Sequence, residues 1–248
     1  MWDNPRLLNL TANALIGLAA LIFAYAGLQL LLRSPLFPLK EVVVRGELKH
    51  ADRREIAGAM DGVGGNFFAA DLAAVRERLE QVGWVRRVDL RRVWPDRLEV
   101  TLEEHVAFAR WAGGGLVNTF GEPFSTQAGD ESARELPLFA GPAGSEGEVT
   151  KRYRSFAGVL APLGALPERV VLTPRYAWQL HTGGAQNGAL NLELGRDGAE
   201  SVETRLARFV AAYAESLGRL PQRGATEQAF VDLRYPNGFA LRVAGWKG

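Results

Sequence analysis

The hydrophobic pattern of the chain begins with one long apolar stretch near the N-terminus. Residues 7–32 contain no charged side chain, and Arg6 and Arg33 flank them. As a helix, this stretch would be about 39 Å long, more than the roughly 30 Å hydrocarbon core of a bilayer. We therefore expect a short cytoplasmic tail over residues 1–9 and a transmembrane helix over residues 10–33.

Two other interpretations of this stretch stay open. A cleaved signal peptide would use Ala24-Tyr25-Ala26 as its cleavage site, but the apolar run continues to Leu32 and exceeds a usual signal core. A buried globular helix is the other alternative, and such helices rarely lack a polar face. Flanking charges do not favour a cytoplasmic N-terminus, yet a domain this large can translocate regardless of local charge. We expect the soluble part to lie outside the cytoplasm.

Residues 36–105 carry the pattern of a small α+β domain. The expected elements are a strand over 41–45, a helix from Asp52 to Met60, a helix from Asp71, and strands over 84–93 and 97–104. The last two strands form a hairpin in which one face is apolar and the other is charge-matched. The pairs in this register are Val93 with Arg97, Leu90 with Val100, and Arg91 with Glu99. Two helices would then cover one face of a three-stranded sheet.

A second, β-rich domain is expected over residues 106–246. Residues 106–111 begin it, and its predicted elements are strands over 116–120, 169–173, 176–181 and 188–194, and helices over 148–160 and 200–217. Residues 121–147 are rich in Gly, Pro, Ser and Glu and are expected to be loop. The whole chain is therefore predicted to be an α+β protein: one N-terminal transmembrane helix, a β-α-α-β-β domain, and a C-terminal β-domain with a mainly antiparallel sheet flanked by helices.

The clearest local signal is a hairpin over residues 229–244. A three-residue loop, Pro236-Asn237-Gly238, would place Tyr235 opposite Phe239 and Leu233 opposite Leu241, which gives one apolar face. Proline suits the second position of a type I turn, and Gly238 is expected in the left-handed conformation.

The last strand of this hairpin is a candidate binding surface. If it lies at the sheet edge, its unpaired backbone groups could bind an extended peptide by strand addition. The alternative is an ordinary terminal hairpin buried within the sheet.

Composition excludes several classes of function. The net charge is +1, and residues 34–248 hold 27 basic and 27 acidic side chains, so charge gives no case for nucleic-acid binding. The arginines between Arg76 and Arg97 alternate with acidic residues, as in a solvated surface. Without cysteine there are no disulfides or zinc thiolate sites, and the three histidines show no metal-ligand spacing. We expect no metal and no cofactor.

No enzyme motif stands out. The loop Gly62-Val-Gly-Gly65 lacks the lysine and serine or threonine of a Walker loop, and Gly144-Ser145-Glu146-Gly147 lacks the spacing of a nucleophile elbow. Glu103, Glu104 and His105 end a strand, and we interpret them as solvated charge. We therefore expect a protein without enzymatic activity or a small-molecule substrate.

The order of elements resembles the FtsQ/DivIB family of bacterial cell division proteins over nearly the whole chain. Residues 37–46, and 83–88 together with 94–98, resemble the polypeptide-transport-associated (POTRA) module, which other families also contain. Residues 231–240, Val-Asp-Leu-Arg-Tyr-Pro-Asn-Gly-Phe-Ala, are more specific to this family. Pro236 and Asn237 follow its pattern less closely.

The resemblance implies a division scaffold of the inner membrane at the septum, with a cytoplasmic N-terminus and a periplasmic bulk. It implies partners in the FtsB–FtsL pair and a link to septal peptidoglycan synthesis, with FtsB adding a strand beside residues 239–244. The implied partner-binding residues are Arg234, Tyr235, Asn237, Gly238, Phe239, Ala240, Leu241, Arg242 and Val243. Two alternatives are a POTRA-containing periplasmic adaptor in protein secretion or outer-membrane assembly, and a membrane-anchored hydrolase, which no motif supports.

Overall fold

A computed structural model describes residues 5–34, 37–63, 66–125, 131–185, 188–215 and 228–243. The chain divides into two compact units, residues 1–104 and 105–248. The first unit begins with helix α1 (Pro5–Arg33), within which Leu8–Leu31 are apolar and long enough to cross a membrane by length and composition. This helix has no buried apolar side chain among its described residues.

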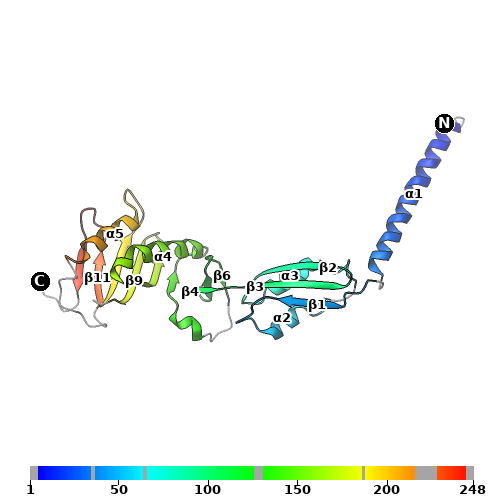
Figure 1. The fold of residues 1–248 in the computed structure, drawn as a ribbon. Helices are drawn as coiled ribbons and strands as arrows, with labels where there is room; N and C mark the ends of the chain where they lie inside the picture. The colour runs from blue at the N-terminus through cyan, green and yellow to red at the C-terminus, as the bar shows by residue number, and fades with distance from the viewer. Residues whose placement is uncertain are drawn as a thin grey trace. The chain divides into compact units, whose positions relative to one another are not determined.

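The rest of the first unit is a three-stranded sheet with two helices (Figure 1). Its elements are β1 (Glu41–Arg45), α2 (Arg53–Ala59), α3 (Leu72–Glu80), β2 (Val85–Val93) and β3 (Arg97–Glu104). The strand order is β1-β3-β2, with β1 parallel and β2 antiparallel to β3. The predicted strand–helix–helix–strand–strand arrangement is confirmed.

Local sequence signals determine how these elements begin and pair. The side chain of Asp52 accepts a hydrogen bond from the Arg54 N–H, and that of Asp71 accepts from the N–H groups of Ala73 and Ala74, so each aspartate caps the helix expected to begin there. The predicted register of the β2–β3 hairpin is also confirmed: Val93 lies opposite Arg97, and Leu90 lies opposite Val100. The core lies between the helices and the sheet and includes Ile56, Val75, Leu79, Val88, Leu98 and Val100.

The second unit is a nine-stranded sheet in the order β12-β11-β10-β9-β8-β7-β4-β5-β6. Its strands are β4 (Ala107–Trp111), β5 (Leu116–Asn118), β6 (Pro123–Phe124), β7 (Leu138–Ala140), β8 (Pro167–Leu172), β9 (Trp178–Ala185), β10 (Gly188–Gly195), β11 (Gln228–Asp232) and β12 (Ala240–Val243). Its helices are η1 (Glu131–Glu135), α4 (Glu146–Leu160), η2 (Ala161–Leu163) and α5 (Val202–Tyr213). Helices α4 and α5 lie along one face of the sheet (Figure 1).

Two sequence expectations for this unit were wrong in detail. Residues 121–147 are not all loop, because they contain β6, η1 and the buried strand β7, which lies between β4 and β8 and is parallel to both. The strand predicted from Tyr176 begins at Trp178, because the Tyr176 N–H donates to the Thr173 carbonyl oxygen in a tight turn and Tyr176 has a φ of 57°. The end of the helix predicted over 200–217 lies partly outside the described residues.

The apolar faces of α4 and α5 build the core of this unit against the sheet. Phe156 and Phe209 are fully buried, and Trp178 and Phe139 fill the space between helix and strand. Burial of side chains of this size contributes about 1.5–3 kcal/mol each. The aromatic side chains of both helices therefore belong to the core.

Candidate functional site

The C-terminal hairpin lies at one end of the nine-stranded sheet. Strand β11 pairs in parallel with β10 and antiparallel with β12. Among the described residues, β12 pairs with β11 alone and is the outermost strand. No described strand pairs with the other side of its backbone, and an edge of this kind can hydrogen-bond with another extended chain.

The register of this hairpin differs from the sequence expectation by two residues. Leu241 lies opposite Val231 and Ala240 opposite Asp232, whereas the expectation placed Leu241 opposite Leu233. The Leu233 N–H donates to the carbonyl oxygen of Glu193 at 2.9 Å, which keeps Leu233 beside β10 and lengthens the connection to residues 233–239. Because the register differs by an even number of residues, each side chain still lies on the predicted face of the hairpin. The expectation that Gly238 adopts the left-handed conformation was wrong, because the φ of Gly238 is not positive.

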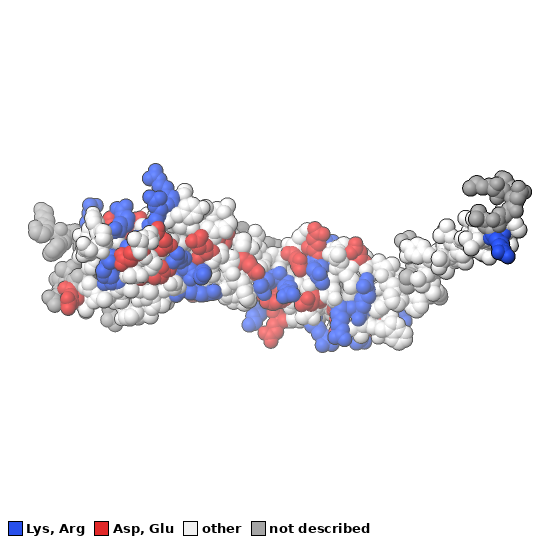
Figure 2. Space-filling view, turned by 90° about the horizontal axis from the view of Figure 1, so that it is seen from above, with Lys and Arg blue, Asp and Glu red and all other residues white. Residues whose placement is uncertain are grey.

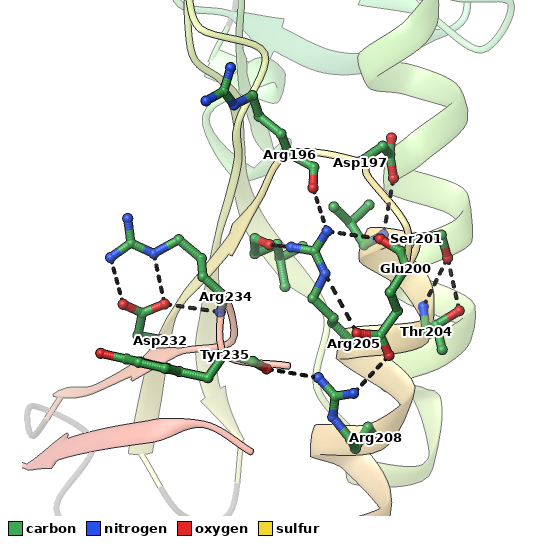
Figure 3. Close-up of polar contacts among 12 residues, drawn as sticks. Arg196, Asp197, Glu200, Ser201, Thr204, Arg205, Arg208, Asp232, Arg234 and Tyr235 are labelled. Carbon is green, nitrogen blue, oxygen red and sulfur yellow. Dashed lines mark hydrogen bonds and ion pairs between the residues drawn. The ribbon is translucent and has the colours of Figure 1, made fainter. Parts of the chain in front are cut away.

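The connection 233–239 is held by an ion pair between neighbouring residues, shown in Figure 3. Asp232 accepts hydrogen bonds from Nε and Nη2 of Arg234 at 2.9 and 2.6 Å, and from the Arg234 main-chain N–H at 3.0 Å. These bonds hold the pKa of Asp232 below its ordinary value, although burial alone would raise it. Asp232 in turn raises the pKa of Arg234. Arg234 is 60% exposed, so one face of its side chain remains accessible.

Helix α5 supports the connection from the other side. Arg208 donates to a carboxylate oxygen of Glu200 at 2.7 Å and to the main-chain carbonyl of Tyr235 at 3.2 Å. In Figure 3 the ring of Tyr235 extends away from this helix, and 54% of the residue is exposed. The Tyr235 backbone is thus fixed while its ring is available for contact.

Arg205 anchors the region between β10 and α5. It is buried, and its guanidinium donates to the carbonyl oxygens of Leu194, Arg196 and Glu200. Gly195 has a φ of 74°, and a Cβ there would come within 2.9 Å of Cγ of Arg234. Glycine at this position therefore permits the close approach of Arg234 to the end of β10.

The residues implied by the resemblance fall into two groups. Phe239 and Leu241 are half-buried and pack against the core, with the Phe239 ring 5.3 Å from that of Phe209. Asn237, Ala240 and Arg242 are exposed together with Arg234 and Tyr235. The structure describes only the backbone of Val243, and Ala244 lies outside the described residues. The structure thus brings these residues together on one hairpin and its connection.

Sequence reasoning missed the residues that position this hairpin. A groove beside the connection is lined in part by Arg175, Arg196, Arg205, Arg234 and Pro236. These residues come from four separate segments, so no local sequence pattern indicates that they lie together. No group of three or more His, Asp or Glu side chains that could hold a metal ion occurs within the described parts of the chain. Acidic and basic side chains are mixed over the surface seen in Figure 2.

The fold defines a class of protein: an apolar helix long enough to cross a membrane, a POTRA module, and a β-domain whose last described strand lies at the edge of the sheet. The family model "POTRA domain, FtsQ-type" matches residues 37–105, and "Cell division protein FtsQ/DivIB, C-terminal" matches residues 109–234. The chain belongs to the FtsQ/DivIB family of cell division proteins.

Named relatives match over almost the full length. The cell division protein FtsQ of Burkholderia pseudomallei is 43% identical, over 100% of this chain and 96% of the relative. That of Nitrosospira multiformis is 41% identical, over 98% and 99% of the two chains. FtsQ of Escherichia coli is 33% identical, over 84% of this chain and 73% of its own length. Membership of the family implies partners among the proteins of the division machinery.

Proposed function

We propose that the chain is a non-enzymatic scaffold of the inner membrane at the division septum. Its N-terminus lies in the cytoplasm, α1 crosses the membrane once, and the POTRA module and β-domain lie in the periplasm. It binds the FtsB–FtsL pair and links early division proteins to septal peptidoglycan synthesis. The family favours this role over that of an adaptor in secretion or outer-membrane assembly.

The partner strand is added beside β12, and the observation that carries this proposal is the terminal place of β12 in the sheet. An added strand would gain main-chain hydrogen bonds from β12, while side chains on and near the hairpin would provide specificity. The exposed residues Arg234, Tyr235, Asn237 and Arg242 adjoin this edge, together with Gly238 and Ala240. Phe239, Leu241 and Val243 complete the proposed contact set.

A proline scan tests strand addition. In an antiparallel pair the N–H groups of successive residues point alternately toward β11 and toward the free edge. One of Leu241 and Arg242 therefore presents its N–H to the edge, and proline at that residue removes a donor needed by the partner without breaking the β11–β12 ladder. The full-length chain, in detergent, is titrated with the purified FtsB–FtsL pair.

We expect one of Leu241→Pro and Arg242→Pro to keep the melting temperature of the parent protein while binding about 10–100-fold more weakly. Leu241→Ala and Arg242→Ala are the matched controls, because each loses the same side chain but keeps its N–H. If both proline variants fold and bind the pair normally, strand addition at β12 is wrong.

A further inference from the structure

Three segments of the first unit meet where the chain leaves α1. The Lys40 N–H donates to the carbonyl oxygen of Asp96 at 2.9 Å, and the two side chains form an ion pair at 3.1 Å. The Phe67 N–H donates to the carbonyl oxygen of Phe37 at 2.7 Å. Residues 37–41, 66–70 and 92–97 therefore form one cluster, which we call the exit tip. Strands β1 and β3 both begin beside it (Figure 1).

The exit tip is tied to the end of the apolar helix by a hydrogen bond as well as by the chain. The side-chain amide of Asn66 donates to the carbonyl oxygen of Ser34, the residue directly after α1, at 2.5 Å. The same side chain accepts from the Phe68 N–H at 2.8 Å, which orders the loop that follows. Residue 37 is only four positions beyond Arg33 and so lies within about 14 Å of it. The tip therefore stays close to the end of the apolar stretch.

Two aromatic side chains of the exit tip are exposed to solvent, although the folding of the domain alone would favour their burial. Trp94 is 75% exposed at the β2–β3 turn, and Phe68 is 43% exposed. The Phe68 ring lies edge-on to that of Phe37, with the ring centroids 5.4 Å apart. This contact fixes the position of the Phe68 side chain. Arg92 donates to the carbonyl oxygens of Phe67 and Ala70, so the exit tip also carries a positive charge.

We propose that the exit tip inserts into the headgroup region of the bilayer that α1 crosses, with Trp94 and Phe68 at the boundary with the acyl chains. Tryptophan and other aromatic side chains favour this boundary, and nearby cations favour anionic headgroups. The short tether to α1 makes the bilayer surface the surface nearest to these rings. The consequence is that the POTRA module rests on the membrane instead of swinging freely on its tether. The inference rests on α1 spanning the membrane, but not on strand addition at β12.

Spin labels measure the depth of the exit tip directly. Because the chain has no cysteine, single-cysteine variants of the full-length protein are labelled at one position only. Nitroxides are placed through Phe68→Cys and Trp94→Cys, and the protein is reconstituted in nanodiscs of phosphatidylcholine and phosphatidylglycerol. Leu21→Cys in α1 is the control for the bilayer interior, and Glu47→Cys, exposed just beyond the far end of β1, is the control for water.

Collision with oxygen, which concentrates in lipid, is compared with collision with a water-soluble nickel chelate. We expect oxygen to relax the labels at 68 and 94 more strongly than nickel, and the reverse at 47. A label at 68 or 94 that behaves like the label at 47 overturns the proposal, as does a label shielded from both reagents, which would indicate a protein contact. If the label at 21 collides with nickel, α1 does not span, and the membrane anchor of the proposed function fails with the exit tip.

Discussion

Asp232 and Arg234 are joined by three hydrogen bonds, two from the guanidinium and one from the main chain, directly after the strand that pairs with β12. These contacts tie the start of the connection 233–239 to the end of β11. It also leaves Arg234 largely exposed beside the proposed docking strand. Arg234 thus orders the start of the connection 233–239, and in the proposed complex it would also present a cation to the partner.

Replacing Arg234 separates these tasks. We expect Arg234→Ala to weaken binding of the FtsB–FtsL pair by about 1–3 kcal/mol, because both the cation and the clamp on Asp232 are lost. Asp232→Asn is the matched variant, since it weakens the clamp but keeps the cation. Calorimetric titration with the purified pair measures both. An unchanged affinity in Arg234→Ala would remove this residue from the binding site.

Gly195→Ala tests the close packing behind the connection. The added methyl group would lie 2.9 Å from Cγ of Arg234 in a backbone conformation that alanine rarely adopts, so we expect a loss of about 1–3 kcal/mol of stability. Gly198→Ala is the control, because nothing lies within 4 Å of the Cβ position there. Thermal unfolding followed by near-ultraviolet circular dichroism compares the two. Equal melting temperatures would contradict the predicted strain.

Glu104 gives the first unit a pH-dependent stability. Its carboxylate accepts the main-chain N–H groups of Lys49, His50 and Ala51. Burial alone would raise the pKa of Glu104, but these hydrogen bonds outweigh it and lower the pKa below the ordinary value of 4.5. A carboxylate with a lowered folded-state pKa contributes stability above its unfolded pKa and loses it as the pH falls through the folded one.

Glu104→Gln should therefore melt at a lower temperature than the parent protein at pH 7, with a cost of about 1–3 kcal/mol. The difference should shrink as the pH falls below about 4.5, because the parent loses its charge there. Glu103→Gln is the control on the exposed face of the same strand. A difference between parent and Glu104→Gln that stays constant down to pH 3 would contradict this account.

Sequence alone predicted those parts of the fold that local signals decide. The register of the β2–β3 hairpin was predicted correctly from Val93 opposite Arg97 to Leu90 opposite Val100, because its short turn and alternating faces admit one favourable register. Strand β7 was missed because Leu138–Ala140 is too short to show a period, and its partners β4 and β8 are distant in sequence. Short buried strands of this kind are specified by the neighbours they pair with rather than by their own residues.

The sequence predicted where the candidate site lies in the chain, but not the register of its hairpin or the contacts of its connection. Alternation over residues 229–244 revealed the hairpin, yet the register shifted by two because Leu233 bonds to Glu193 on another strand. The ion pair of Asp232 with Arg234 and the contact of Arg208 with Tyr235 both lie in the connection that this shift lengthens. The outermost place of β12 follows from the order of nine strands, which the sequence pattern does not encode.

The parallel pairing of β10 with β11 has a consequence for when the molecule becomes competent to recruit partners. Parallel neighbours need a crossover, so β11 can join the sheet only after α5 and the chain beyond it have been synthesised. The strand proposed for docking, β12, follows β11 in the chain and pairs with it alone among the described residues. A chain that ended before β11 could therefore fold its earlier strands and still lack the edge proposed for partner binding.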